Sequence, residues 1–391
     1  MEAVPTVYLD HAATTPITDV AVDAMTARLR EVGNASSLHA SGRRARRIVE
    51  ESRETVAQAL GCRPGEVVFT SGGTEADNLA VKGLFWSRRE VDAARTRVLG
   101  TAVEHHAVLD PLEWLEEHEA ATVELLPVDA AGRLRVESLQ AAIERDPASV
   151  AMITVMWANN EVGTLQPIDE VVRLASAHGI PVHTDAVQAV GSVPVDFAAS
   201  DVDALSISGH KVGGPQGVGA LVVRREVDLT ALLHGGGQER DVRSGTLDVP
   251  AIAGFAAAVE VAVKQQAELA ARLVVLRDRL IEGVRSAVPD VVLNGDPVDR
   301  LPGNVHLSFP GCEGDSLLML LDARGIECST GSACSAGVPQ PSHVLLAMGR
   351  DAAAARSSLR FSLGHTSTAA DVDAVVAAIA PCVERARAAR A

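Results

Sequence analysis

The amino-acid sequence predicts an α/β protein with a mainly parallel β-sheet. Short apolar segments rich in β-branched residues alternate with amphipathic helical segments through about the first 250 residues, and Gly-rich turns follow several of them. This alternation favours a parallel sheet, because a parallel connection between two strands needs a crossover that is usually a helix. The chain has 391 residues, an ordinary length for two domains or one large domain.

The expected helices and strands follow one another in a regular order. We expect a helix over 43–60, because Ile48, Val49, Val56 and Leu60 lie on or near one helical face. Further helices are expected near 75–82, 107–119 and 168–178. Apolar, β-branched segments bounded by turn residues predict strands at 66–70, 96–102, 151–157, 181–185, 204–208 and 218–223.

The pattern changes after about residue 250. Residues 251–288 are nearly all helix-forming, and they precede expected strands at 305–309 and 359–363, a helix at 314–323 and a helical C-terminal segment. Residues 327–340 are rich in Gly, Ser, Cys and Pro, and we expect them to form a mobile loop. We therefore place a domain boundary near residue 255.

Composition and charge exclude several classes of protein. Acidic residues outnumber basic ones 51 to 35, and the net charge of −16 argues against direct, non-specific nucleic-acid binding. The longest apolar-rich stretch, residues 251–263, is too short to cross a bilayer and contains Glu260, so no membrane association is expected. No signal peptide is expected, and the five cysteines are an odd number. These features predict a cytoplasmic protein with reduced thiols.

A glycine-rich turn at residues 69–75 is a candidate phosphate site. The expected strand ends in Phe69 and Thr70, and Ser71, Gly72 and Gly73 follow it before a helical segment. Backbone N–H groups and the positive end of the helix would face an anion bound in such a turn. The turn lacks the Gly-Lys-Ser/Thr ending of a Walker P-loop. An ordinary helix cap explains the same residues, so the turn alone does not decide between the two.

A carboxylate and an amine follow two other expected strands. Asp185 ends an apolar strand, where an isolated charge is costly, so it needs a cation or hydrogen-bond donors. Its simpler explanation is an N-cap of the next helix. Lys211 follows a buried-type strand and precedes two glycines, whereas Lys82 and Lys264, the only other lysines, lie in helical segments. A lysine held in a site lowers its pKa readily, which suits Schiff-base chemistry, although a surface-loop lysine is the alternative.

The loop at 327–340 contributes two thiols, Cys328 and Cys334. A thiol with an ordinary pKa of about 8.5 is already partly thiolate and nucleophilic at neutral pH. The spacing of five residues with no nearby histidine matches no common zinc pattern, so no metal site is expected. Two unreactive loop thiols remain the alternative. Taken together, an anion-binding turn, a carboxylate, an amine and a thiol meet the requirements of a pyridoxal 5′-phosphate (PLP) enzyme.

The sequence resembles the cysteine desulfurases, the NifS/IscS-like group of class-V aminotransferases among the fold-type-I PLP enzymes. The match runs nearly from end to end, and the joint order of its motifs is more specific than any one of them. The motifs lie at residues 8–16 (YLDHAATTP), 70–78 (TSGGTEADN), 104–105 (EH), 159–163 (NNEVG), 185–188 (DAVQ), 208–211 (SGHK), 243–246 (RSGT), 331–334 (GSAC) and 360–364 (RFSLG).

The resemblance implies a fold and a division into domains. The fold would be a large PLP-binding domain over 15–255, with a mainly parallel seven-stranded sheet flanked by helices. Residues 1–14 and 256–391 would form a smaller α+β domain that carries the mobile catalytic loop. The resemblance also implies a homodimer, because Thr246 would contact the cofactor phosphate of the neighbouring subunit.

The resemblance further implies a role for each candidate residue. Lys211 would carry PLP as a Schiff base and move the substrate proton, and Cys334, in its Gly-Ser-Ala-Cys context, would accept sulfur in preference to Cys328. His105 would stack on the ring, Asp185 would pair with its nitrogen, and Gln188 would bind its hydroxyl oxygen.

The remaining cofactor contacts would come from Gly73, Thr74, Asn160, Ser208 and His210. Asn34, Asn160 and Arg360 would bind the substrate carboxylate, although Asn34 lacks the proline that follows it in many relatives.

The activity implied by the resemblance is removal of sulfur from L-cysteine, which yields L-alanine and a persulfide on Cys334. The persulfide would pass to an acceptor protein for iron–sulfur cluster assembly, for tRNA thiolation, or for both. Selenocysteine lyase and class-V aminotransferase activities are the nearest alternatives, and transamination needs no thiol. A catalytically silent scaffold, or a nucleotide-binding α/β protein, would leave the Lys211 and Cys334 motifs unexplained.

Overall fold

A seven-stranded sheet forms the centre of the protein in the computed structural model, which describes residues 6–331 and 341–389. The strand order is β2-β8-β7-β6-β5-β3-β4, and only β8 runs antiparallel to its two neighbours. The strands are β2 (Val67–Thr70), β3 (Arg97–Thr101), β4 (Thr122–Leu126), β5 (Val150–Thr154), β6 (Val182–Asp185), β7 (Ala204–Ser208) and β8 (Gly219–Val223). The predicted mainly parallel sheet is confirmed.

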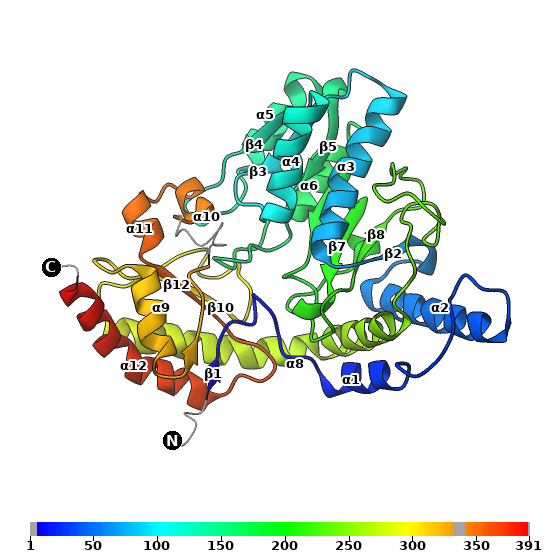
Figure 1. Ribbon diagram of the computed structural model, residues 1–391. Helices are drawn as coiled ribbons and strands as arrows, with labels where there is room; N and C mark the ends of the chain where they lie inside the picture. Colours follow the sequence, from blue (N-terminus) through cyan, green and yellow to red (C-terminus); the bar gives the residue numbers. More distant parts are fainter. Residues whose placement is uncertain (1–5, 332–340, 390–391) are drawn as a thin grey trace.

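Helices cover both faces of this sheet (Figure 1). The apolar side chains of α3 (Gly73–Val91) and α4 (His106–Glu119) pack on one face, against Val68, Val98 and Met152. Apolar side chains of α2 (Ala40–Leu60), α5 (Val136–Arg145), α6 (Ile168–Ser176), α7 (Phe197–Ser200) and the start of α8 (Val249–Ala287) pack on the other face. Neighbouring residues of a strand point to opposite faces, so each buried strand supplies both layers.

A second region with its own apolar core follows the long helix α8. Its three-stranded antiparallel sheet has the order β12-β10-β9, and a pair of parallel strands, β1 and β11, lies beside it. These strands are β1 (Val7–Tyr8), β9 (Val292–Leu293), β10 (Asn304–Ser308), β11 (Ile326–Glu327) and β12 (Ser358–Ser362). The helices are α9 (Gly314–Asp322), α10 (His343–Ala347), α11 (Ala352–Arg356) and α12 (Ala369–Ala388). In Figure 1, α8 runs beneath both regions, from α1 (Asp19–Thr26) to α12.

Most of the expected elements lie within a few residues of the observed ones. Several elements have no counterpart among the expected ones, among them α1, β4, α5 and α7. For β4 the reason is that it is an edge strand with exposed Thr122 and Leu125 and therefore lacks a continuous apolar run. The helix expected at 75–82 ends nine residues before α3 does, at Val91. Residue 255 lies inside α8, so the domain boundary that we propose there falls within one continuous helix. Within the described residues, no helix is long and apolar enough to cross a membrane.

A buried ion pair holds the loop at residues 233–246 against the sheet. Arg53 on α2 donates hydrogen bonds to both carboxylate oxygens of Glu239 at 2.7 Å, and also to the carbonyl oxygen of Val67 at 2.7 Å. The backbone N–H of Phe69 on β2 donates to the same carboxylate at 2.9 Å. The two side chains are 8% and 0% exposed. Because the charges are buried together with several hydrogen bonds, removal of one partner leaves the other uncompensated.

We expect Arg53→Met to lower the free energy of unfolding by about 3–5 kcal/mol, because Glu239 would stay buried without its cation. The matched control is Arg47→Met on the same helix, since Arg47 pairs with Glu51 at 71% and 63% side-chain exposure. That control is expected to change the free energy by at most about 1 kcal/mol. Denaturant unfolding of the two variants measures both values. Equal effects of the two substitutions would contradict the expectation.

Candidate active site

One cavity lies at the carboxyl ends of the central strands, where ligands bind in open α/β sheets. It has a volume of about 380 Å³. Ten of the residues expected from the sequence line it: Gly73, Thr74, His105, Asn160, Asp185, Gln188, Ser208, His210, Lys211 and Arg360. These residues come from segments up to 287 positions apart in the chain, between Gly73 and Arg360, and the parallel strands bring most of them to the same edge of the sheet.

Lys211 stands at the end of a single 3₁₀ turn, Gly209–Lys211, that follows β7. Its Nζ donates hydrogen bonds to the carbonyl oxygens of Ala12 at 2.6 Å and Ala13 at 2.7 Å. Burial lowers the pKa of the Lys211 ammonium to about 8, and the charge of the nearby Arg360 guanidinium contributes to this shift. In mildly basic solution, Lys211 is therefore a neutral amine in a substantial fraction of the molecules. Nucleophilic attack on an aldehyde requires this neutral form.

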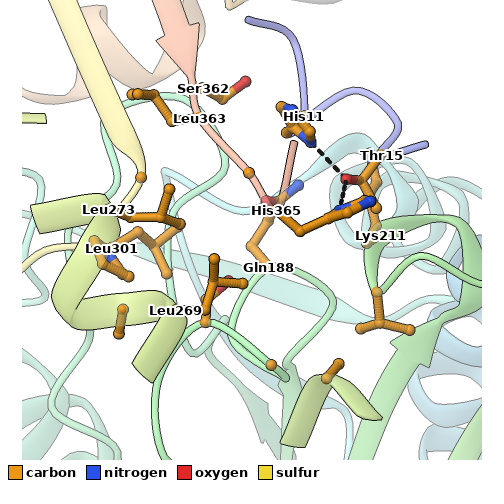
Figure 2. A pocket seen from close by; sticks show the side chains of 18 of the residues that line it. His11, Thr15, Gln188, Lys211, Leu269, Leu273, Leu301, Ser362, Leu363 and His365 are labelled. Atoms are coloured by element: carbon orange, nitrogen blue, oxygen red, sulfur yellow. Dashed lines mark hydrogen bonds between the residues drawn. The ribbon is translucent and has the colours of Figure 1, made fainter. Parts of the chain in front are cut away.

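A second, smaller cavity lies beside Lys211. Figure 2 shows it with Leu269, Leu273 and Leu301 on one side and Lys211 and Thr15 on the other. Its volume is about 150 Å³. Gln188 borders both cavities and donates a hydrogen bond to the carbonyl oxygen of Ala12 at 2.9 Å. The N-terminal segment thus holds the lysine and the glutamine through the same carbonyl group.

Asp185 lies at the end of β6 and is 6% exposed. Its Oδ1 accepts a hydrogen bond from the backbone N–H of Val187 at 2.9 Å. Burial raises the pKa of the carboxyl to about 6, while the Val187 hydrogen bond and the Lys211 charge oppose this rise. A buried carboxylate with few donors needs a cationic partner. A protonated pyridine nitrogen supplies such a partner, so Asp185 fits the PLP ring.

A second buried carboxyl, that of Asp77 on α3, lies near Asp185. Burial raises its pKa well above the ordinary value, and the Asp185 charge raises it further. Two close carboxylates do not both ionise readily, so we assign the proton to Asp77 and the charge to Asp185. Asp77 is not among the residues to which the sequence assigns a role. A signal was present, because Asp77 follows Gly73 by four residues and such spacing places both on one helical face.

His105 follows β3 and forms the N-cap of α4, with its ring exposed to the cavity. Its Nδ1 accepts a hydrogen bond from the backbone N–H of Ala107 at 3.1 Å. The surrounding protein displaces water and lowers the pKa of the imidazole to about 4, and the Lys211 charge adds to this effect. The ring is therefore neutral at physiological pH, with its Nε2 carrying the proton. A neutral, oriented ring suits stacking on an aromatic cofactor.

The turn before α3 leaves room for an anion. Gly72 has φ 156° and ψ −177°, a conformation that residues with a side chain rarely adopt. A Cβ atom on Gly73 would lie 2.9 Å from Val187 Cγ2, so only glycine permits this close approach. Thr74, Ser208 and His210 line the same part of the cavity, and burial lowers the pKa of His210 to about 4. These groups fit a phosphate at a helix N-terminus.

Arg360 on β12 brings the second region into the cavity. Its Nη2 donates to Asp10 Oδ1 at 2.7 Å, and its Nη1 donates to the carbonyl oxygen of Asn160 at 3.0 Å. Its Nε is buried without a hydrogen-bond partner among the described residues. An arginine oriented from two sides, with a donor still free, suits recognition of a carboxylate.

Two expected site residues, Asn34 and Thr246, do not line the cavity within one chain. Asn34 is exposed, and its Oδ1 accepts a hydrogen bond from the backbone N–H of Ser36 at 2.9 Å. Thr246 is exposed at the end of loop 233–246. Cys334 lies outside the described residues. Burial raises the pKa of the Cys328 thiol to about 12, so Cys328 is not a nucleophile at neutral pH.

Tertiary folding adds residues that no sequence pattern indicates. His343 at the start of α10 lines the cavity, and its Nε2 hydrogen-bonds the carbonyl oxygen of Glu104 at 2.9 Å. The Ala12 and Ala13 carbonyl groups hold Lys211 from almost 200 residues away in the chain. Backbone groups carry no sequence signature, so only the structure identifies this contact.

Comparison with known proteins identifies the family of the chain. The family model described as "Aminotransferase class-V" matches residues 7–375. The chain is 59% identical to "IscS-like cysteine desulfurase" of Mycobacterium tuberculosis, over 97% of each chain.

Two solved structures resemble the fold. The structure titled "NIFS-LIKE PROTEIN" has a TM-score of 0.90 at 34% identity, covering 97% of this chain and 100% of that one. "SspA in complex with cysteine" has a TM-score of 0.79 at 34% identity, covering 91% of this chain and 98% of that one. The predicted fold class is confirmed. The family uses PLP. The relatives of this chain include IscS-like cysteine desulfurases. This chain therefore belongs to the class-V aminotransferase family, in its NifS/IscS-like group.

Proposed function

We propose that this chain is a cysteine desulfurase, which converts L-cysteine to L-alanine and leaves the sulfur atom as a persulfide on Cys334. The observation that carries the proposal is the convergence of Lys211, Asp185, His105 and Arg360 on one cavity beside a glycine-rich turn. The relatives named as cysteine desulfurases, and a similar structure described as a complex with cysteine, support this choice of substrate.

The residues of the cavity suit the bound cofactor. Asp185 would pair with the ring nitrogen, His105 would stack on the ring, and Gln188 would bind the ring hydroxyl oxygen, with Asn160 as a neighbouring contact. The phosphate would be held by Gly73, Thr74, Ser208 and His210. When bound, PLP supplies an aldehyde that joins the Lys211 amine and a ring that accepts electrons from the substrate.

The chain's own groups then divide the work of the reaction. Arg360 binds the substrate carboxylate, assisted by Asn160, and Asn34 is a further candidate for this contact. The Lys211 amine takes the proton from the substrate Cα and later returns one, because its lowered pKa lets it act as a base. The Cys334 thiolate attacks the substrate sulfur. The overall exchange is balanced: a thiol and cysteine give a persulfide and alanine, with no external oxidant or reductant.

A homodimer is part of the proposal. Thr246 is exposed in its own chain, at the end of a loop that is anchored to the sheet through Glu239, and it would contact the phosphate in the neighbouring subunit. The N-terminal part of the chain exposes apolar side chains that a partner subunit would cover: Ile17, Val20, Leu29, Val32 and Leu38. Leu29, Val32 and Leu38 are 62%, 83% and 85% exposed, and several exposed apolar side chains within one segment are typical of an interaction site.

Sulfur would leave the enzyme by transfer to an acceptor protein. We propose acceptors of iron–sulfur cluster assembly, tRNA thiolation, or both, in the cytoplasm. Four arginines at positions 43, 44, 46 and 47 are exposed on α2 of a protein with net charge −16. This local positive surface is a candidate docking point for an acidic acceptor.

Lys211→Ala is expected to abolish the visible absorbance of bound PLP, because no other amine of the described cavity can join the aldehyde. Lys82→Ala is the matched control, since Lys82 lies over the Trp114 ring at 4.4 Å and does not line the cavity. Its absorbance should equal that of the unmodified protein. Spectra recorded after gel filtration decide the matter, and a persistent visible band in the Lys211 variant would refute the assignment.

Cys334→Ala is expected to retain the visible band but to lose formation of both alanine and sulfide from L-cysteine under reductant. Cys62→Ala should retain both products. Alanine, sulfide and keto-acid are measured in the same reaction. Keto-acid in place of alanine would instead indicate an aminotransferase, and undiminished sulfide release by the Cys334 variant would exclude that residue as acceptor.

The pH dependence of cofactor attachment follows from the lowered pKa of Lys211. Below pH 8 the amine is mostly protonated, so the rate of PLP attachment to cofactor-free protein should rise about tenfold per pH unit and level off above about pH 8. Stopped-flow absorbance between pH 6 and 10 measures this rate. A free lysine derivative, with a pKa of about 10.4, is the control whose rate continues to rise. The same continued rise in the protein would contradict a lowered pKa.

A further inference from the structure

The turn that is proposed to hold the cofactor phosphate carries a carboxylate of its own. Glu75 lies in the first turn of α3, and its Oε2 accepts a hydrogen bond from the backbone N–H of Ser71 at 2.7 Å. The positive end of the helix and the N–H groups of this turn are the features that would attract a phosphate. A bare Glu75 carboxylate would compete with the phosphate for them and would repel it.

Arg243 neutralises this carboxylate. Its Nε donates to Glu75 Oε1 at 2.8 Å and its Nη2 donates to Oε2 at 3.3 Å, so the contact is bidentate. Both side chains are 16% exposed. Burial alone raises the pKa of Glu75, but the hydrogen bonds from Arg243 and Ser71 outweigh it and leave the pKa below its ordinary value. Glu75 is therefore an anion in the folded protein, and among the described residues Arg243 is the cation that pairs with it.

Hydrogen bonds within loop 233–246 hold Arg243 in position. The N–H of Gly245 donates to Gln238 Oε1 at 2.8 Å, and the N–H of Glu239 donates to the carbonyl oxygen of Arg243 at 2.9 Å. Glu239 is itself fixed by the buried Arg53 pair. The ion pair between Glu239 and Arg53 therefore anchors the loop that brings Arg243 to Glu75.

We propose that Arg243 is a positioning residue for cofactor binding, and that it acts through Glu75: it cancels a negative charge that would otherwise weaken binding of the phosphate. This inference rests on the proposed function, because it requires the phosphate to bind at the Gly73–Thr74 turn. It assigns Arg243 no contact with the cofactor. Its consequence is that loss of Arg243 harms phosphate binding only while Glu75 keeps its charge.

A double-mutant cycle tests the proposal by titration of cofactor-free, full-length protein with PLP, followed by visible absorbance. Arg243→Met should raise the Kd about tenfold to a hundredfold, the range for loss of a charged hydrogen-bonded partner. Glu75→Gln, which keeps the Ser71 hydrogen bond, should change the Kd by less than about threefold, and so should the double variant Glu75→Gln/Arg243→Met. Arg243→Lys should restore most of the affinity, because it keeps the charge.

Two controls separate the electrostatic role from a merely structural one. Pyridoxal, which lacks the phosphate, should bind the Arg243→Met variant and the unmodified protein with similar Kd. Arg97→Met breaks an ion pair with Glu124 at the start of β3, away from the cavity at the carboxyl end of the strand, and should leave the Kd for PLP unchanged.

Several outcomes would overturn the inference. A double variant as weak as Arg243→Met, or an equal loss of affinity for pyridoxal and PLP, would show that Arg243 only supports the fold. An unmodified protein that takes up no PLP would instead refute the proposed function, so the two failures are distinguishable.

Discussion

The alignment of strands in the central sheet is the constraint on which the site depends. Because β3, β5, β6 and β7 are mutually parallel, their carboxyl ends meet at one edge, and the residues that follow them face one space. His105, Asp185 and Lys211 each lie at or just beyond such an end. In an antiparallel arrangement, the carboxyl ends of neighbouring strands would lie at opposite edges of the sheet, and the residues that follow them would not meet. The hydrophobic layers that cover both faces of the sheet therefore also determine where the polar groups gather.

Burial of charge is the second recurring theme, and it has opposite consequences at different places. At Asp185 and Lys211, burial moves each pKa toward neutrality, to about 6 and about 8, so both groups lie near the range where proton transfer is efficient. At Arg53 and Glu239, two buried charges satisfy each other and anchor a loop. Asp185 and Lys211 can still interact with a cofactor, whereas the charges of Arg53 and Glu239 are already satisfied by each other.

Contacts between distant segments complete the cavity. Residues 10–15 extend from the second region to Lys211, and Arg360 extends from β12 to Asp10 and to the Asn160 carbonyl. Both connections cross between the two apolar cores. A displacement of one region relative to the other would therefore change the surroundings of the lysine and the arginine together. The same contacts between the two regions therefore position both the proposed cofactor site and the proposed site for the substrate carboxylate.

The sequence by itself determined the α/β class, most of the elements and the identity of the candidate cofactor residues, because periodicity and motifs such as 208–211 are local properties of the chain. It missed the edge strand β4, whose half-exposed residues form no apolar run. Only the tertiary structure decided which groups meet: the Ala12 and Ala13 carbonyls at Lys211, the Asp77 carboxyl beside Asp185, and the Arg243–Glu75 pair at the phosphate turn. The pKa values, too, depend on burial and on neighbours distant in the chain. Such effects are set by three-dimensional packing, which no local pattern encodes.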